Sequence, residues 1–181
     1  LTETSPAATI NPLHMTDFNG SIGLPISSTE ISIRDNIGIE VPLGQVGEVC
    51  VRGPQVMKGY WQRPEETANV MYGDGFLKTG DMGYIDHLGY VFLVDRKKDM
   101  ILVSGFNVYP NEVEEAVAMH EGVSDVAAIG VHDDNSGEAV KIFVVRKDPN
   151  LTAEALIAHC RKQLTGYKVP KHVEFRADLP R

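Results

Sequence analysis

Hydroxyl and carboxylate side chains stand next to one another at the start of the chain, in the segment LTETSP (residues 1–6). Mg²⁺ prefers hard oxygen ligands and is often bound through one carboxylate together with substrate phosphates. The neighbours Thr2 and Glu3 therefore indicate a site that can hold a phosphate and its Mg²⁺ ion. The alternative is a solvated, frayed chain end, which is common in the first residues of a domain.

A second carboxylate follows a glycine in the segment LKTGD (residues 77–81). A carboxylate can accept two hydrogen bonds at once, as the two hydroxyls of a ribose would offer. Asp81 is therefore a candidate ligand for a nucleotide sugar. The competing interpretation is an aspartate that accepts hydrogen bonds from the backbone of its own turn.

Five charged residues in a row, DRKKD at 95–99, separate two apolar segments. Arg96 can hold a nucleotide, and Lys97 or Lys98 can act as a hinge. A solvated charged turn is the ordinary alternative for such a run.

A locally basic segment, GYKVPK (residues 166–171), lies in a chain that is acidic as a whole. Together with Arg161, Lys162 and Arg176 it could meet the phosphates of a ligand. Basic side chains near a helix C-terminus are also favoured by the helix dipole, without any ligand.

Two kinds of element must position these side chains. Residues 21–94 contain short alternating strands with frequent Gly and Pro, which predict a small barrel or sandwich, with one short helix headed by Pro64. Residues 97–181 alternate helix and strand signals, as expected for a small α+β domain. Asn111 and Glu114 have the spacing of a helix capping box. The predicted boundaries are a β-rich part at 1–94, a hinge at 95–99 and an α+β part at 100–181.

Composition excludes several classes of protein. The 181 residues carry 17 basic and 25 acidic side chains, a net charge of −8, which argues against general binding to a nucleic-acid backbone. Two widely separated cysteines form neither a disulfide framework nor a zinc motif, so we expect a reducing, cytoplasmic setting. The histidines show no metal-binding spacing. No apolar run approaches the length of a membrane span, and the first residues lack the pattern of a signal peptide.

Taken together and in order, five segments resemble the adenylate-forming superfamily, which includes acyl-CoA synthetases, luciferases and the adenylation domains of peptide synthetases. Within it, the unbroken run VDRKKDMILVSGFNVYPNEVE is most similar to the long-chain fatty-acid–CoA ligases. The segments that carry the resemblance are LTETSP, GEVCVRGPQVMKGYW, GFLKTGD, VDRKKDMILVSGFNVYPNEVEE and LTGYKVPKHVEF.

The resemblance implies a fold and a set of roles. Residues up to about 94 would be the tail of a large N-terminal domain, mostly its β-barrel subdomain, followed by a small, mobile and incomplete C-terminal domain. Matched motif by motif, the residues would divide as follows: Thr2 at the adenylate phosphate, Glu3 as the Mg²⁺ ligand, Asp81 and Arg96 at the ribose, Lys98 as the hinge, and Gly105 along the path of the CoA pantetheine.

The resemblance also implies a reaction. A fatty acid attacks ATP in the presence of Mg²⁺, pyrophosphate leaves, and the acyl-adenylate passes its acyl group to CoA. The family's phosphate loop and fatty-acid tunnel would precede Leu1, and its C-terminal lysine would follow Arg181. We therefore expect a piece of a longer ligase that is inactive by itself.

Two other functions compete with this one. An adenylation enzyme could use another acceptor, such as a carrier-protein thiol or oxygen. A non-catalytic nucleotide-binding module would need only the segments present. Acyl chain length, oligomeric state and peripheral association with a membrane are left open by the sequence.

Overall fold

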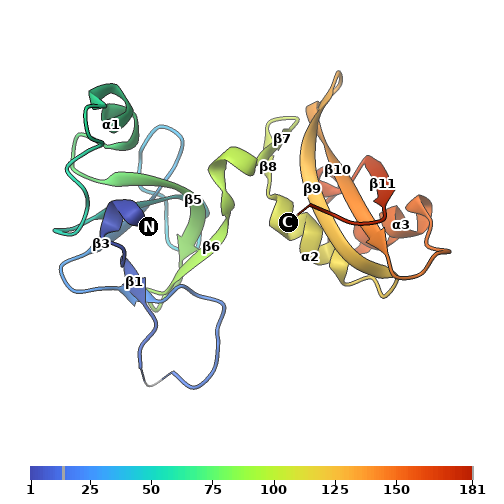
Figure 1. The fold of residues 1–181 in the computed structure, drawn as a ribbon, viewed down its shortest axis with the longest axis horizontal. Coiled ribbons are helices and arrows are strands. Elements are labelled where there is room, and N and C mark those ends of the chain that lie inside the picture. Colours follow the sequence, from blue (N-terminus) through green and yellow to red (C-terminus); the bar gives the residue numbers. More distant parts are fainter. Residues whose placement is uncertain (14, 181) are drawn as a thin grey trace. The chain divides into compact units, whose positions relative to one another are not determined.

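The computed structural model describes residues 1–13 and 15–180 (Figure 1). The chain folds into two compact units, Leu1–Lys97 and Lys98–Arg181. The division falls inside the charged run at 95–99, and the hinge role of that run stays a prediction. None of the described helices is long and apolar enough to cross a membrane.

The first unit is built on a four-stranded antiparallel sheet in the order β3-β4-β5-β6. Its strands are β3 (Glu30–Arg34), β4 (Gly47–Arg52), β5 (Leu77–Ile85) and β6 (Val91–Arg96). The smaller elements are the 3₁₀ turn η1 (Thr2–Thr4), the strand pair β1 (Thr9–Ile10) and β2 (Leu24–Pro25), and helix α1 (Pro64–Val70), which begins at the predicted proline.

The expected barrel is an open sheet among the described residues of this unit, because β3 and β6 form its two edges. Strand β4 is buried on both faces, with the apolar Val49 and Val51 on one side and Glu48 and Cys50 on the other.

The second unit has a five-stranded sheet in the order β11-β10-β7-β8, with β9 paired to β10. This mixture of helices and strands confirms the predicted α+β class. Its strands are β7 (Ile101–Val103), β8 (Phe106–Val108), β9 (Val123–Asp133), β10 (Gly137–Arg146) and β11 (His172–Arg176). Its helices are α2 (Pro110–Ala118) and α3 (Ala153–Gln163), and η3 (Gly166–Lys168) is a 3₁₀ turn, whereas the 3₁₀ turn η2 (Lys97–Asp99) spans the boundary between the two units.

Helices α2 and α3 contribute to one apolar core with the sheet, in which Val117, Ile142 and Leu156 are fully buried. The predicted capping box of α2 is wrong. The helix begins at Pro110 after Tyr109, and the Glu114 carboxylate instead accepts a hydrogen bond from the Ala128 N–H at 2.8 Å. The Glu114 side chain, which local spacing assigned to the start of the helix, therefore binds strand β9 instead.

The turn between β9 and β10 is organised by the Asp133 carboxylate. It accepts hydrogen bonds from the Ser136 hydroxyl at 2.8 Å and from the backbone N–H groups of Asn135 and Ser136. The Lys171 ammonium lies 3.1 Å away. These donors, the Ser136 hydroxyl foremost, hold the pKa of Asp133 well below its usual range.

Replacing Asp133 with asparagine should lower the thermal unfolding midpoint at pH 7, and the deficit should shrink as the pH falls below about 4. A carboxylate whose pKa is lower in the folded state stabilises that state above its unfolded pKa and loses the effect as it protonates. Unfolding midpoints of both proteins between pH 2.5 and 7 test this. Asp134→Asn is the control, because that carboxylate is 95% exposed. A deficit that does not vary with pH would contradict the assignment.

Candidate functional site

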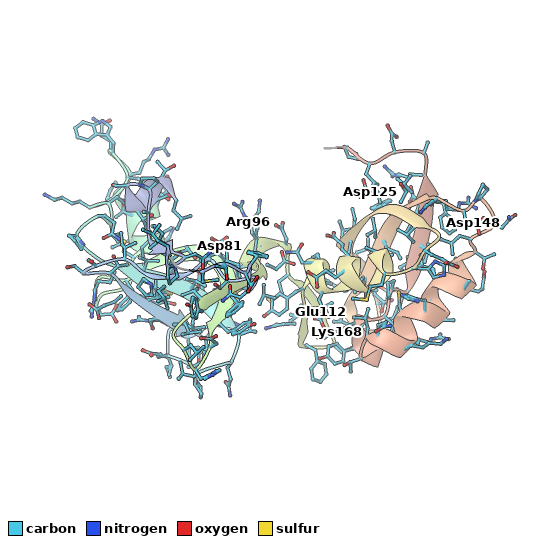
Figure 2. All side chains as sticks on the ribbon, turned by 90° about the horizontal axis from the view of Figure 1, so that it is seen from below. Asp81, Arg96, Glu112, Asp125, Asp148 and Lys168 are labelled. Carbon is cyan, nitrogen blue, oxygen red and sulfur yellow. The ribbon has the colours of Figure 1, made fainter. Side chains whose placement is uncertain are left out.

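Asp81 on β5 and Arg96 on β6 are opposite one another in the antiparallel ladder. The Arg96 Nε lies 3.7 Å from the Asp81 Oδ1, and Figure 2 shows the two side chains as neighbours. The Asp81 side chain is 21% exposed, whereas that of Arg96 is 65% exposed. The pair thus places a half-buried acceptor beside a cation that stays accessible to a ligand.

Burial raises the pKa of the Asp81 carboxyl, and the Arg96 guanidinium partly offsets this effect. The Asp81 carboxylate has lost contact with water, and the protein supplies too few hydrogen-bond donors to compensate for that loss. A ligand that brings hydroxyl donors would therefore stabilise its charged form. Two vicinal hydroxyls of a ribose meet this requirement.

Asp81 stands at the edge of a cavity of about 430 Å³ in the first unit. The cavity brings the start of the chain, at Leu1 and Pro6, to the same place as Thr79 and Asp81. The remaining lining residues are mostly small or apolar: Ala7, Ala8, Thr9, Ile22, Ile31, Val49, Val51 and Leu93. An apolar floor with a carboxylate at its edge suits a nucleoside, because the base is flat and the sugar is polar.

The segment at residues 1–6 is an ordered turn in the structure. Thr4 is fully buried, and its hydroxyl lies 2.8 Å from the Pro6 carbonyl and 3.1 Å from the Leu1 carbonyl. The Glu3 carbonyl accepts a hydrogen bond from the Met57 N–H at 2.8 Å. The Thr2 side chain is exposed. The local fold therefore fixes the backbone of the two predicted ligands.

Replacing Thr4 with valine should destabilise the first unit by about 1–3 kcal/mol, because the Pro6 carbonyl loses its buried donor while the side-chain volume is kept. Denaturant unfolding of the 181-residue chain measures this. Thr16→Val, at an exposed position, should change stability by less than about 0.5 kcal/mol. Equal stability of Thr4→Val and the natural chain would show that the turn is not held by this hydroxyl.

The Glu3 carboxylate accepts a hydrogen bond from the Tyr60 hydroxyl at 3.1 Å. This bond is the main cause that raises the pKa of Tyr60. Tyr60 belongs to a segment that the sequence analysis used only as part of the resemblance. The two partners are 57 positions apart in the sequence, so no local signal marks the contact.

The charged run at 95–99 is divided in its contacts. Arg96 faces Asp81, Lys97 forms an ion pair of 2.8 Å with Glu48, and Lys98 is exposed. The sequence analysis treated the segment of Glu48 as a strand and did not predict this buried ion pair. A charged residue among the apolar positions of a buried strand was the available signal.

Gly105 lies in the second unit, at the two-residue turn that joins β7 to β8. Ser104 has φ of 51° and Gly105 has φ of 85°, so both residues adopt the left-handed conformation of a tight hairpin turn. The Ser136 carbonyl accepts a hydrogen bond from the Ser104 N–H at 2.8 Å. The turn is thus anchored on one side and exposes its glycine backbone on the other.

The basic segment at 166–171 does not form a free basic patch. The Lys168 ammonium lies 2.7 Å from both oxygens of Glu112, and Figure 2 shows these two side chains meeting. Lys171 is paired with Asp133, and Arg176 with Glu174. The carboxylates therefore neutralise most of the charge that the sequence suggested for a phosphate. Arg161 and Lys162 are exposed in the last turn of α3, as the helix dipole favours.

Comparison with known proteins adds an independent line of evidence. Residues 1–61 match the family model of AMP-binding enzymes, and residues 112–181 match that of the AMP-binding enzyme C-terminal domain. All 181 residues are 59% identical to a long-chain-fatty-acid–CoA ligase of Escherichia coli O6:H1 and 47% identical to one of Bacillus subtilis. The chain spans 32% of the length of either relative.

Solved structures agree with the sequence matches. The whole chain superposes with a TM-score of 0.92 and 39% identity on ATP-bound MatB from Rhodopseudomonas palustris, of which it covers 36%. It superposes with a TM-score of 0.86 and 34% identity on o-succinylbenzoate CoA synthetase from Bacillus subtilis in complex with its acyl-adenylate, of which it covers 37%.

Proposed function

Because this chain belongs to the AMP-binding enzymes, we propose that it is part of an ATP-dependent fatty-acid–CoA ligase, acting on long-chain acids. The observation that carries the proposal is the half-buried Asp81 beside Arg96, at a cavity that Leu1 and Pro6 also line. We propose a cytoplasmic setting, in line with the two buried, free cysteines.

In this proposal the nucleotide lies against the first unit. Asp81 accepts hydrogen bonds from the ribose hydroxyls, and Arg96 reaches the same sugar. Thr2 offers its exposed hydroxyl to the adenylate phosphate. The apolar floor of the cavity excludes water from one side of the nucleoside, which strengthens the polar contacts at its edge.

Mg²⁺ fits the residues present when it is shared with the phosphates. Among the described residues, no group of three or more His, Cys, Asp or Glu side chains could hold a metal ion. Mg²⁺ does not require such a group, since it commonly binds through one or two carboxylates, substrate phosphates and water. We propose that Glu3 supplies the carboxylate, with Tyr60 fixing one of its oxygens. When bound, the ion offsets the charge of the phosphates during attack by the fatty carboxylate.

The second half-reaction transfers the acyl group from AMP to the thiol of CoA. It needs different groups next to the same acyl carbon, and a rigid rotation of one unit about a few residues can supply them. The boundary between the two units, at Lys97 and Lys98, supports a hinge at Lys98. The open glycine backbone of the Gly105 turn suits the close approach of a pantetheine chain.

Another acceptor is the second candidate function. Residues covering 89% of this chain are 43% identical to the amide bond synthetase McbA from Marinactinospora thermotolerans. An adenylation enzyme whose acceptor is not CoA would use the same contacts of Asp81, Arg96 and Glu3. The acceptor therefore has to be decided by product analysis.

The test is a product analysis of the full-length protein that contains this chain. AMP and acyl product are measured by mass spectrometry with ATP, Mg²⁺ and acids of short, medium and long chain, with and without CoA. We expect AMP and acyl-CoA to rise together for long acids. AMP release that never depends on CoA would favour the other acceptor, and no response to any fatty acid would contradict the proposal. The 181-residue chain alone should form no acyl-CoA.

A further inference from the structure

Glu48 is a buried carboxylate in the middle of the first unit, with 4% of its surface exposed. Its Oε2 lies 2.8 Å from the Lys97 ammonium, and its Oε1 accepts a hydrogen bond from the Gly80 N–H at 3.2 Å. A buried charge is retained at low cost only when it is paired and hydrogen-bonded. Both oxygens of Glu48 meet this condition.

The two partners of Glu48 belong to two different segments of the nucleotide site. Gly80 directly precedes Asp81, and Lys97 directly follows Arg96. Glu48 therefore contacts the backbone next to Asp81 and the side chain next to Arg96, the two residues proposed to bind the ribose.

The strand ladder is irregular at this point. Glu48 is opposite Met82, whereas Cys50 is opposite Lys78, so the three residues 79–81 face Val49 alone. Such bulges interrupt the ladder and redirect a side chain, and they are common next to active sites. Here the bulge carries Asp81, and the Glu48 carboxylate accepts a hydrogen bond from the N–H of Gly80, the central residue of the bulge. The left-handed φ of 75° at Gly80 is one that residues with side chains rarely adopt.

Lys97 is the last residue of the first unit and precedes the exposed Lys98. Its ammonium is held by a side chain from β4, so the chain is anchored to the sheet up to this position. The ion pair is unlike the exposed pair of Arg52 with Glu30 on the same sheet, whose carboxylate side is 62% exposed.

We propose that Glu48 is a positioning residue with two tasks: it holds the bulge that presents Asp81, and it clamps Lys97 so that rotation between the two units begins at Lys98. This inference rests on the proposed function for its catalytic consequence. The clamp itself is a property of the fold and can be tested without turnover.

The experiment uses the full-length enzyme with Glu48→Gln, which keeps the shape and one acceptor for Gly80 while removing the charge that binds Lys97. Hydrogen exchange of the amides at 97–99 should become about tenfold faster, the change expected when one charged hydrogen bond is lost from a local opening. Single-turnover thioester formation should slow by about tenfold relative to adenylate formation, because an unclamped hinge places the second unit less accurately. Unchanged exchange at 97–99 would overturn the proposal.

Four further variants separate a clamp from a general loss of stability. Lys97→Met should reproduce the effects of Glu48→Gln. Lys97→Arg, which keeps the positive charge, should leave amide exchange and thioester formation near the natural values. The double variant Glu48→Gln/Lys97→Met should be no worse than the more affected single variant. Glu30→Gln, which breaks the exposed pair on the same sheet, should change neither measurement. Effects of Glu48→Gln and Lys97→Met that multiply would overturn the clamp.

The outcomes also separate this inference from the proposed function. If Glu48→Gln does not fold, Lys97→Met and Lys97→Arg decide by the same criteria. If the natural enzyme makes no acyl-CoA but the exchange results are as expected, the ligase assignment fails and the clamp stands. If the natural enzyme is a ligase and amide exchange at 97–99 is unchanged in all these variants, the clamp is contradicted and the ligase assignment is kept.

Discussion

Replacing Asp81 with asparagine in the full-length enzyme should lower kcat/KM for ATP by about 100-fold to 1,000-fold. Each hydrogen bond to a charged acceptor contributes about 1.5–3 kcal/mol, and the proposed ribose contact contains two of them. Asparagine keeps the size of the side chain but offers one neutral acceptor. The rate of acid-dependent AMP formation at increasing ATP concentration measures the change, which should appear mainly as a higher KM.

The matched control is Asp86→Asn in the same hairpin, at the turn between β5 and β6. The Asp86 carboxylate accepts hydrogen bonds from the backbone of its own turn, at Leu88 and Tyr90, and asparagine can replace it there. This variant should retain kcat/KM for ATP within about twofold. Asp81→Asn with a normal KM for ATP would show that the ribose is bound elsewhere.

Replacing Glu3 with glutamine should have an equally large effect, of about 1,000-fold on adenylate formation at a fixed Mg²⁺ concentration. Charge stabilisation by a bound metal ion contributes several kcal/mol to phosphoryl chemistry, and each 1.4 kcal/mol is a factor of about ten in rate. The amide oxygen of glutamine can still accept a hydrogen bond from the Tyr60 hydroxyl, so the turn at residues 1–6 should stay folded. Pyrophosphate-forming activity as a function of Mg²⁺ concentration measures the effect.

Tyr60→Phe is the informative companion to Glu3→Gln. It removes the hydroxyl that lies 3.1 Å from Glu3 and leaves the carboxylate in place. We expect a loss of less than about tenfold, as for one hydrogen bond, with a higher Mg²⁺ requirement. A Glu3→Gln enzyme with natural activity and natural Mg²⁺ dependence would refute the role assigned to this carboxylate.

Local signals in the sequence were sufficient for many elements. Thr152 caps α3, where its hydroxyl accepts a hydrogen bond from the Ala155 N–H three residues on. Pro64 begins α1, and the turn at 86–89 joins β5 to β6. These features depend on residues within four positions of one another, so one short segment contains all the information. The α+β class follows from the same periodic patterns.

The candidate site was only partly accessible to sequence reasoning. Local patterns made Asp81, Arg96, Glu3 and Lys98 candidates, but their specific roles came from the resemblance, because each local pattern also had an ordinary structural explanation. Whether they bind a nucleotide and move about a hinge remains a set of predictions for the experiments above. The structure adds the register that places Asp81 opposite Arg96 and the cavity that Asp81 lines together with Leu1 and Pro6.

Local residue patterns were enough to predict the helices and short strands, because each pattern lies within one short segment, and five such segments in order carried the family resemblance. Which charges are paired depends on long-range packing. Lys168 pairs with Glu112, 56 positions away in the sequence, and this pair neutralises part of the basic segment. Lys97 pairs with Glu48, 49 positions away, so a residue of β4 contacts the end of the first unit. The tertiary structure also decided that β3 and β6 form the edges of the first unit's sheet among the described residues. Such pairings depend on which strands and helices pack together, because a charge buried by packing must find its partner wherever the fold brings one within reach.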